Sequence, residues 1–174
     1  LGEFQSGESI LVVHKNGEFY TTDFDLNNHY DADIQFIEKF DAEKVWTAVL
    51  YDADQQNYPY LKRFTFEQTA KRLNYLGENK QLILLSGEVY PRLQVVFGGH
   101  DSFREALIIE ASDFVGVKSF KAKGKRLTTF TVDRIEELEP TRRPEPQEDM
   151  EDADTPETEN DNVAEEDNEQ MTLF

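Results

Sequence analysis

Residues 10–24 read "ILVVHKNGEFYTTDF", and this stretch decides the fold. An aliphatic run is followed by Asn16-Gly17 and then by a segment rich in aromatic and β-branched residues. An Asn-Gly pair between two such runs is the strongest short-range signal for a β-hairpin, because both residues tolerate the positive φ of tight hairpin turns. We therefore predict an antiparallel pair of strands that turns at Asn16-Gly17.

The same arrangement recurs three more times along the chain. Further copies begin with the aliphatic runs Val45–Leu50, Leu82–Leu85 and Ala106–Ile109. Their expected turns lie within Asp52–Tyr58, at Ser86-Gly87 and near Ser112-Asp113. Additional strands are predicted at Asp33–Phe40 and Leu127–Val132, and a short helix is the alternative only at Glu67–Leu76. The fold class is therefore expected to be all-β.

A hairpin cannot bury its apolar face alone, so the copies must stack on one another. Successive aliphatic runs start about 24 to 37 residues apart, which lies in the range of repeat architectures. A propeller-like ring of sheets and a β-sandwich both satisfy this pattern. The residues alone leave the two architectures open.

The charge of the chain is divided unevenly. The formal net charge is −18, yet residues 145–174 hold 13 of the 36 acids and none of the 18 basic residues, which leaves −5 for residues 1–144. A segment so acidic and so poor in apolar residues is expected to be disordered. The exit carries Pro140, Pro144 and Pro146. We therefore predict a folded domain at residues 1–139 and a linker with an acidic tail at residues 140–174.

Several classes of protein are excluded or disfavoured. The chain has no cysteine, which rules out disulfides and thiolate metal sites. It has no apolar run of about 20 residues and no signal-peptide pattern, so we expect a cytoplasmic protein without a membrane partner. His14, His29 and His100 are too widely separated for a metal-binding motif. No catalytic or metal-ligating residue is therefore predicted.

A basic stretch, "FVGVKSFKAKGKRLTTFTV" at residues 114–132, stands out in this acidic chain. In a strand, alternate residues share one face about 6 to 7 Å apart, which is close to the spacing of phosphates along a DNA strand. Gly124 would permit a tight turn or a close approach to a phosphate. A solvated rim is the alternative interpretation. The predicted DNA-binding residues are Lys118, Lys121, Lys123, Lys125, Arg126 and Thr128, with Lys62, Arg63 and Arg92 as outlying members.

The run "ALIIEASDFVGVKSFKAKGKRLTTFTVDRIEEL" at residues 106–138 resembles the last blade of the C-terminal domain of the A subunits of bacterial type IIA DNA topoisomerases. Topoisomerase IV is the closer match, because the glycine-rich box of gyrase has no counterpart in "HKNGEFYTTDF". The resemblance implies a β-pinwheel, here of about three blades in a complete or incomplete ring. It also implies a non-catalytic domain that bends double-stranded DNA for a cleavage core outside this chain, during decatenation or relaxation. The parent would use Mg²⁺, together with ATP through its ATPase subunit.

The last five residues, "QMTLF", resemble the pentapeptide that binds the bacterial sliding clamp. Gln170, Leu173 and Phe174 would be the contact residues. The acidic tail before them either competes with DNA for the basic stretch or serves solubility, and the composition fits both. The alternative for the whole chain is a β-repeat module that recruits partners such as the clamp and has no significant DNA affinity.

Overall fold

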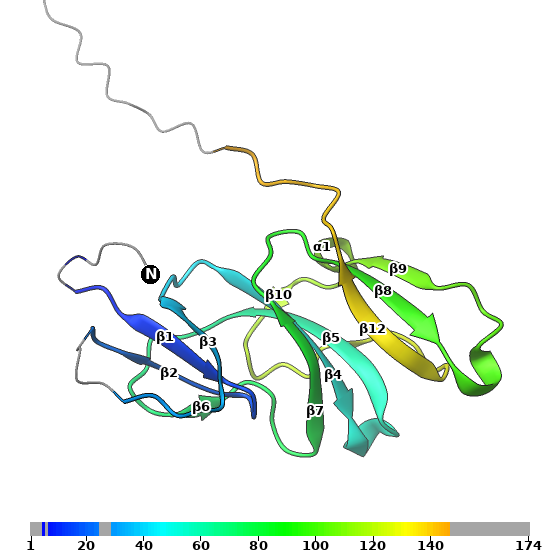
Figure 1. The fold of residues 1–174 in the computed structure, drawn as a ribbon, viewed down its shortest axis with the longest axis horizontal. Coiled ribbons are helices and arrows are strands. Elements are labelled where there is room, and N and C mark those ends of the chain that lie inside the picture. Colours follow the sequence, from blue (N-terminus) through cyan, green and yellow to red (C-terminus); the bar gives the residue numbers. More distant parts are fainter. Residues whose placement is uncertain (1–4, 6, 25–28, 147–174) are drawn as a thin grey trace, which may run out of the picture. The chain divides into compact units, whose positions relative to one another are not determined.

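The structure is a computed structural model that describes residue 5, residues 7–24 and residues 29–146. Nearly all of its regular structure is β-strand (Figure 1). The strands are β1 (Ile10–His14), β2 (Glu18–Thr22), β3 (Ile34–Lys39), β4 (Val45–Asp52), β5 (Tyr58–Thr65), β6 (Leu73–Asn74), β7 (Lys80–Ser86), β8 (Arg92–Phe97), β9 (Leu107–Glu110), β10 (Val117–Lys118), β11 (Lys125–Arg126) and β12 (Val132–Leu138). The helical turns are η1 (Ala53–Gln55), η2 (Gly99–Asp101) and α1 (Ala111–Phe114).

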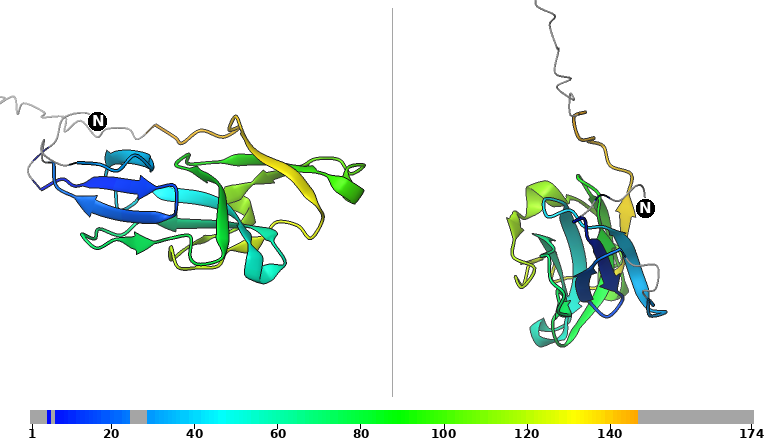
Figure 2. Two further views of the ribbon diagram at one scale, coloured as in Figure 1. Left: turned by 60° about the horizontal axis from the view of Figure 1, so that its bottom comes forward. Right: turned by 90° about the vertical axis from the view of Figure 1, so that its left-hand side faces the viewer.

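The strands form three sheets, which confirms the prediction of an all-β, pinwheel-like fold with about three blades. The first sheet has the order β3-β1-β2-β6 and the third has the order β12-β8-β9. The middle sheet has the order β10-β5-β4-β7, and β11 also pairs with β5. Figure 1 shows the middle sheet between the other two, and Figure 2 shows the same order from another side.

The first predicted hairpin is confirmed. Strands β1 and β2 pair antiparallel with Val13 opposite Phe19. Gly17 closes the turn with a φ of +91°, and its amide donates to the carbonyl of His14 at 3.1 Å. A Cβ at Gly17 would lie 2.5 Å from the Cβ of Leu76, so the position requires glycine for space as well as for backbone angle.

The second hairpin, β4 with β5, is also confirmed, but the third and fourth are wrong. Strand β7 pairs with β4 in the middle sheet, whereas β8 pairs with β9 and β12 in the third sheet. The Ser86-Gly87 stretch is therefore a crossover between sheets. Unlike Gly17, Gly87 does not adopt a positive φ, so it does not form the type of turn that joins paired strands. The Ser112-Asp113 turn belongs to α1, after which β10 joins β5.

Two further local predictions need correction. The predicted strand Leu127–Val132 is a loop in the structure, and the strand begins at Val132 instead. The possible helix at Glu67–Leu76 is not helical and contains the short strand β6.

The middle sheet is covered on both faces, which explains why β4 reads as a nearly continuous apolar run. Alternate residues of a strand point to opposite faces, and Trp46 and Leu50 belong to a core shared with the first sheet. Val49 of β4 and Leu61 of β5 belong to a second core shared with the third sheet. Strand β5 therefore has fixed surroundings on both faces, and it positions the basic stretch that pairs with it.

Some predictions fall outside the described residues. The predicted acidic tail from residue 147 onward and the clamp-binding residues Gln170, Leu173 and Phe174 all lie there. By its internal contacts the chain divides into residues 1–144 and residues 145–174. Within the described residues, no helix has the length and apolar character needed to cross a membrane.

Candidate nucleic-acid interface

The basic stretch returns to β5 twice, once through each of its two short strands. Strand β10 pairs parallel with β5, so that Lys118 lies opposite Phe64. Strand β11 pairs antiparallel with β5, so that Lys125 lies opposite Leu61. Between them the chain turns, with the amide of Ala122 donating to the carbonyl of Ser119 at 2.9 Å. We call residues 117–126 the basic segment.

This path of the chain shows that, contrary to the prediction from the sequence, the lysines do not alternate along one strand. Lys121 lies in the turn, Lys123 lies in the loop after it, and Lys125 alone of the three belongs to a strand. The three side chains therefore do not form a row along one strand face. They gather instead around a compact loop that is attached to β5.

Lys62 is predicted from the sequence to bind DNA, but the structure shows that it is buried. Its residue is only 3% exposed, and its ammonium donates to the carbonyl oxygens of Phe120 at 2.6 Å, Ala122 at 3.3 Å and Tyr75. Burial, assisted by the nearby charge of Lys80, lowers the pKa of Lys62 to about 8. Lys62 therefore holds the turn of the basic segment from inside, and we leave it out of the proposed surface.

The packing of the basic segment against β5 requires a glycine at position 124. Its φ is +90°, and a Cβ at this position would lie 2.6 Å from the carbonyl oxygen of Leu61. The close approach that the sequence suggested is therefore an approach to β5 itself. Without a side chain at Gly124, the basic segment can lie directly against the strand.

The exposed bases of the segment have no acidic partner. Lys118, Lys121, Lys123, Lys125 and Arg126 are all exposed, and none forms an ion pair with an acid in the part of the chain that the structure describes. Three exposed bases elsewhere in the described residues, Lys15, Lys71 and Arg143, also have no acidic partner, but they are not neighbours in the sequence. Seven other bases are paired with acids: Lys39, Lys44, Arg72, Arg92, Arg104, Arg134 and Arg142. The positive charge of the basic segment is therefore available to an external anion.

Five bases line one pocket of about 420 Å³ at this surface. Four of them are Arg63, Lys118, Lys123 and Lys125, and the buried Lys62 is the fifth. The ammonium of Lys125 lies 4.3 Å from the centre of the Phe114 ring and donates to the Phe114 carbonyl at 3.2 Å. These contacts hold a cationic concavity of a kind that suits a phosphate group.

The remaining predicted residues lie differently. Arg92 forms a charge contact of 3.3 Å with Glu110, its neighbour across β8 and β9, so its charge is largely neutralised. The hydroxyl of Thr128 accepts from the amide of Phe130 at 3.0 Å and shapes that turn. Arg63 is partly buried and donates to the carbonyl of Val115 at 3.4 Å. Burial lowers the pKa of Arg63, and nearby Asp113 opposes this shift.

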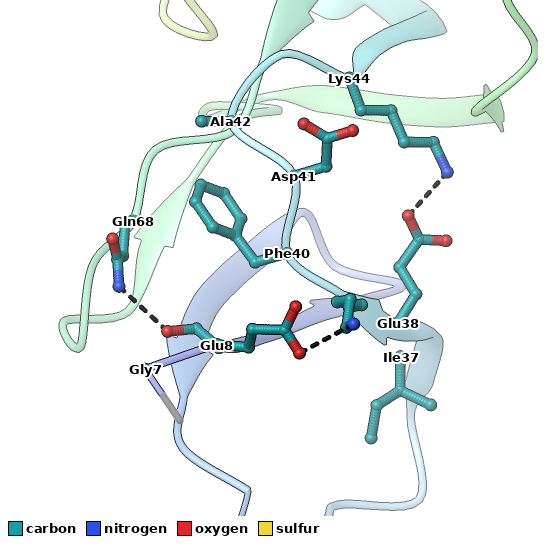
Figure 3. A pocket seen from close by; sticks show the side chains of 11 residues that line it. Gly7, Glu8, Ile37, Glu38, Phe40, Asp41, Ala42, Lys44 and Gln68 are labelled. Carbon is teal, nitrogen blue, oxygen red and sulfur yellow. Dashed lines mark hydrogen bonds and ion pairs between the residues drawn. The ribbon is translucent and has the colours of Figure 1, made fainter. Parts of the chain in front are cut away.

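A larger pocket of about 910 Å³ beside β3 has a different character (Figure 3). Its charged side chains pair across it, with Lys44 2.6 Å from Glu38 and Lys39 2.8 Å from Glu8. Gln68 donates to the hydroxyl of Ser9 at 3.0 Å. Four of its five charged side chains are therefore paired, and the fifth, Asp41, accepts from the amide of Glu43 at 2.9 Å, so we assign no ligand or reaction to this pocket.

One cluster has the residue types of a metal site. Ligand atoms of His14, Asp31 and Asp33 lie within 4.8 Å of one another. However, Nδ1 of His14 bonds Asp33 at 2.9 Å, and Asp31 pairs with Arg72 at 3.1 Å. The bond from His14 lowers the pKa of Asp33. These partners account for the cluster, and we assign no metal to it.

A family model described as the topoisomerase C-terminal domain of Bacteroidota matches residues 1–139. The chain belongs to this family. No curated protein and no solved structure matches the chain. The predicted resemblance is thus confirmed at the level of a topoisomerase C-terminal domain, and the assignment to the A subunit of topoisomerase IV stays a prediction.

In this topoisomerase C-terminal domain, one sequence signal was overlooked. Lys62 alternates with Phe64 along β5, so both side chains point to the same face, and Phe64 is fully buried. The period of the strand therefore already placed Lys62 in the core. The aromatic group around Phe103 and Phe130 was missed as well, because it joins two loops that are distant in sequence.

Proposed function

We propose that this topoisomerase C-terminal domain is the non-catalytic DNA-binding domain of the A subunit of topoisomerase IV. It holds and bends double-stranded DNA and presents it to a cleavage core outside this chain, during ATP-dependent decatenation and relaxation. The observation that carries the proposal is the group of five exposed, unpaired bases on the basic segment, within a domain whose net charge is −5 over residues 1–144.

The physical basis is the release of counterions from DNA. Each phosphate neutralised by a lysine or arginine contributes about 0.9 to the slope of log K against log salt concentration. Relative to about 1 M salt, one such contact therefore raises the affinity at about 50 mM salt by about tenfold. Bases already paired with carboxylates contribute little, because the domain's own acids must first release them.

The fold also indicates how the DNA is recognised. Base reading in the major groove needs a helix or a two-stranded ribbon that enters the groove. Helix α1 has only four residues, and β10 and β11 are bound to the edge of β5. Contacts from the basic segment would therefore go to phosphates, and affinity should depend on how easily the DNA bends rather than on its bases.

The test uses the full chain and a fluorescent linear duplex at low salt. The variant K118Q/K123Q removes two exposed charges that line the basic pocket, whereas R72Q/R134Q removes two charges that are paired with acids. We expect K118Q/K123Q to weaken binding by between about tenfold and a hundredfold, and the control by less than threefold. Equal losses in both variants would refute the assigned surface. A wild-type chain that binds no duplex would refute the function and favour the protein-recruitment alternative.

A further inference from the structure

Two exposed aromatic rings stand beside the basic segment. Phe103, in the loop between β8 and β9, is 77% exposed, and Phe130, in the loop before β12, is 41% exposed. Single exposed apolar residues are common and need no explanation. Here, however, both rings line one groove of about 890 Å³, together with Leu107.

Arg104 joins the two rings into one unit. Its guanidinium carbon lies 3.5 Å from the centre of the Phe130 ring and 5.0 Å from that of Phe103. The guanidinium is held by Asp101 at 2.9 Å, and the other oxygen of Asp101 accepts from the amide of Thr131 at 2.8 Å. The two loops are thus tied together through a single carboxylate.

The Phe130 ring is fixed from below as well. It meets the ring of Phe97 edge to face, with the ring centres 5.9 Å apart, and Phe97 is buried at the end of β8. An aromatic surface that is already ordered loses little entropy when a ligand stacks on it. The groove therefore has the rigidity expected of a binding surface.

The groove continues into the basic segment. Arg126 of β11 lines it, as do Thr128 and Thr129, and Arg126 has no acidic partner among the described residues. Arg126 is adjacent in sequence to Lys125, which lines the neighbouring basic pocket. A ligand that follows this surface meets cations first and flat aromatic rings next, and Glu105 is an acid that also lines the groove.

We infer that the groove formed by Phe103, Arg104 and Phe130 is a stacking site for unpaired bases of single-stranded DNA. Such a strand combines anionic phosphates with aromatic rings that are free to stack, and proteins bind it with cationic tracks and exposed aromatic side chains. A neutral apolar peptide would satisfy the rings but would not use the unpaired cations that continue from the groove. The inference rests on the proposed function for its basic track and adds a second form of DNA as ligand.

The experiment compares two probes with the full chain at low salt: a labelled 20-nucleotide oligothymidine and a 20-base-pair duplex. Phe103→Ala should weaken oligothymidine binding at least fivefold, as expected for the loss of one stacked base, and leave duplex binding within twofold. Phe24→Ala is the matched control, since Phe24 is 51% exposed and follows β2 of the first sheet. It should change neither affinity.

The outcomes separate the two proposals. If Phe103→Ala leaves oligothymidine binding unchanged, or weakens both probes equally, the stacking site is refuted while duplex binding still supports the proposed function. If the wild-type chain binds only oligothymidine and Phe103→Ala weakens that binding, the stacking site stands and the duplex proposal falls. A dimer that Phe103→Ala converts to a monomer would also refute the site, because the rings would then join two copies. As a second measurement, oligothymidine containing 5-iodouracil should photocrosslink to Phe103 or Phe130.

Discussion

The ammonium of Lys62 is buried inside the domain, and the stability of the protein should therefore depend on pH above neutrality. The pKa of Lys62 falls from 10.5 to about 8 because burial removes water from the charged amine. Between these two values the unfolded chain binds more protons than the folded chain. The free energy of unfolding must therefore rise as the pH increases through this window.

The size of the effect follows from the size of the shift. One pKa unit corresponds to about 1.4 kcal/mol, so the whole window is worth about 3 kcal/mol. Most of this, about 2 to 3 kcal/mol, should appear between pH 7 and pH 10. At pH 7 the amine is still protonated and still donates to the carbonyl oxygens of Phe120 and Ala122.

Urea unfolding at a series of pH values, with Lys62→Met beside the wild type, isolates the titration of this amine. Methionine has a similar length and does not titrate, so the wild type should gain about 2 to 3 kcal/mol relative to the variant between pH 7 and pH 10. A constant difference would mean that the carbonyl acceptors fully replace the lost water, and the reasoning would be refuted. If Lys62→Met does not fold, NMR titration of the Lys62 ε-carbon in the wild type gives the pKa directly. A midpoint above about pH 10 would contradict a pKa of about 8 for Lys62.

Three further predictions concern the fold. Gly124→Ala should destabilise the domain by at least about 1 to 2 kcal/mol in urea unfolding, because it combines a φ of +90° with a clash at Leu61. The control is Gly116→Ala, where a Cβ meets nothing within 4 Å, and it should change stability by less than about 1 kcal/mol. Equal effects of the two substitutions would contradict the packing of the basic segment. Tyr75→Phe should stabilise the protein by about 1 kcal/mol at pH 7, since the buried hydroxyl has no hydrogen-bond partner among the described residues. It should also reduce the loss of stability above pH 10, because burial raises the pKa of Tyr75 in the folded state. A large destabilisation would show that the hydroxyl has a hydrogen-bond partner. Trp46, the single tryptophan and 1% exposed, should fluoresce at short wavelength and shift to longer wavelength on unfolding; a native emission typical of exposed indole would contradict the first core.

Sequence reasoning located most of the strands because each aliphatic run has to be buried. It also found the turn at Asn16-Gly17, although only Gly17 adopts the positive φ that was expected of both residues. It assigned the wrong partners to β7 and β9, since a polar turn looks the same whether the chain folds back on its own sheet or crosses to the next one. Only the packing of β4 between two cores decides that question.

The candidate interface was predicted by composition but not by geometry. The bases of residues 118–126 are exposed as expected, yet their spacing follows a turn and two short strands rather than one long strand. Lys62 is buried, because the face of β5 that carries Phe64 also carries Lys62. The unpaired state of the other bases depends on where every acid of the domain lies, and no local pattern contains that information.

The salt dependence of duplex binding tests the central claim most directly, because it counts the phosphate contacts. If all five exposed, unpaired bases of the basic segment contact phosphates, the slope of log K against log salt concentration should be about −4.5 for the wild type. We predict that K118Q/K123Q makes this slope less steep by about 1.8, and that R72Q/R134Q leaves it unchanged. Identical slopes for the wild type and K118Q/K123Q would show that the basic segment does not touch the DNA backbone.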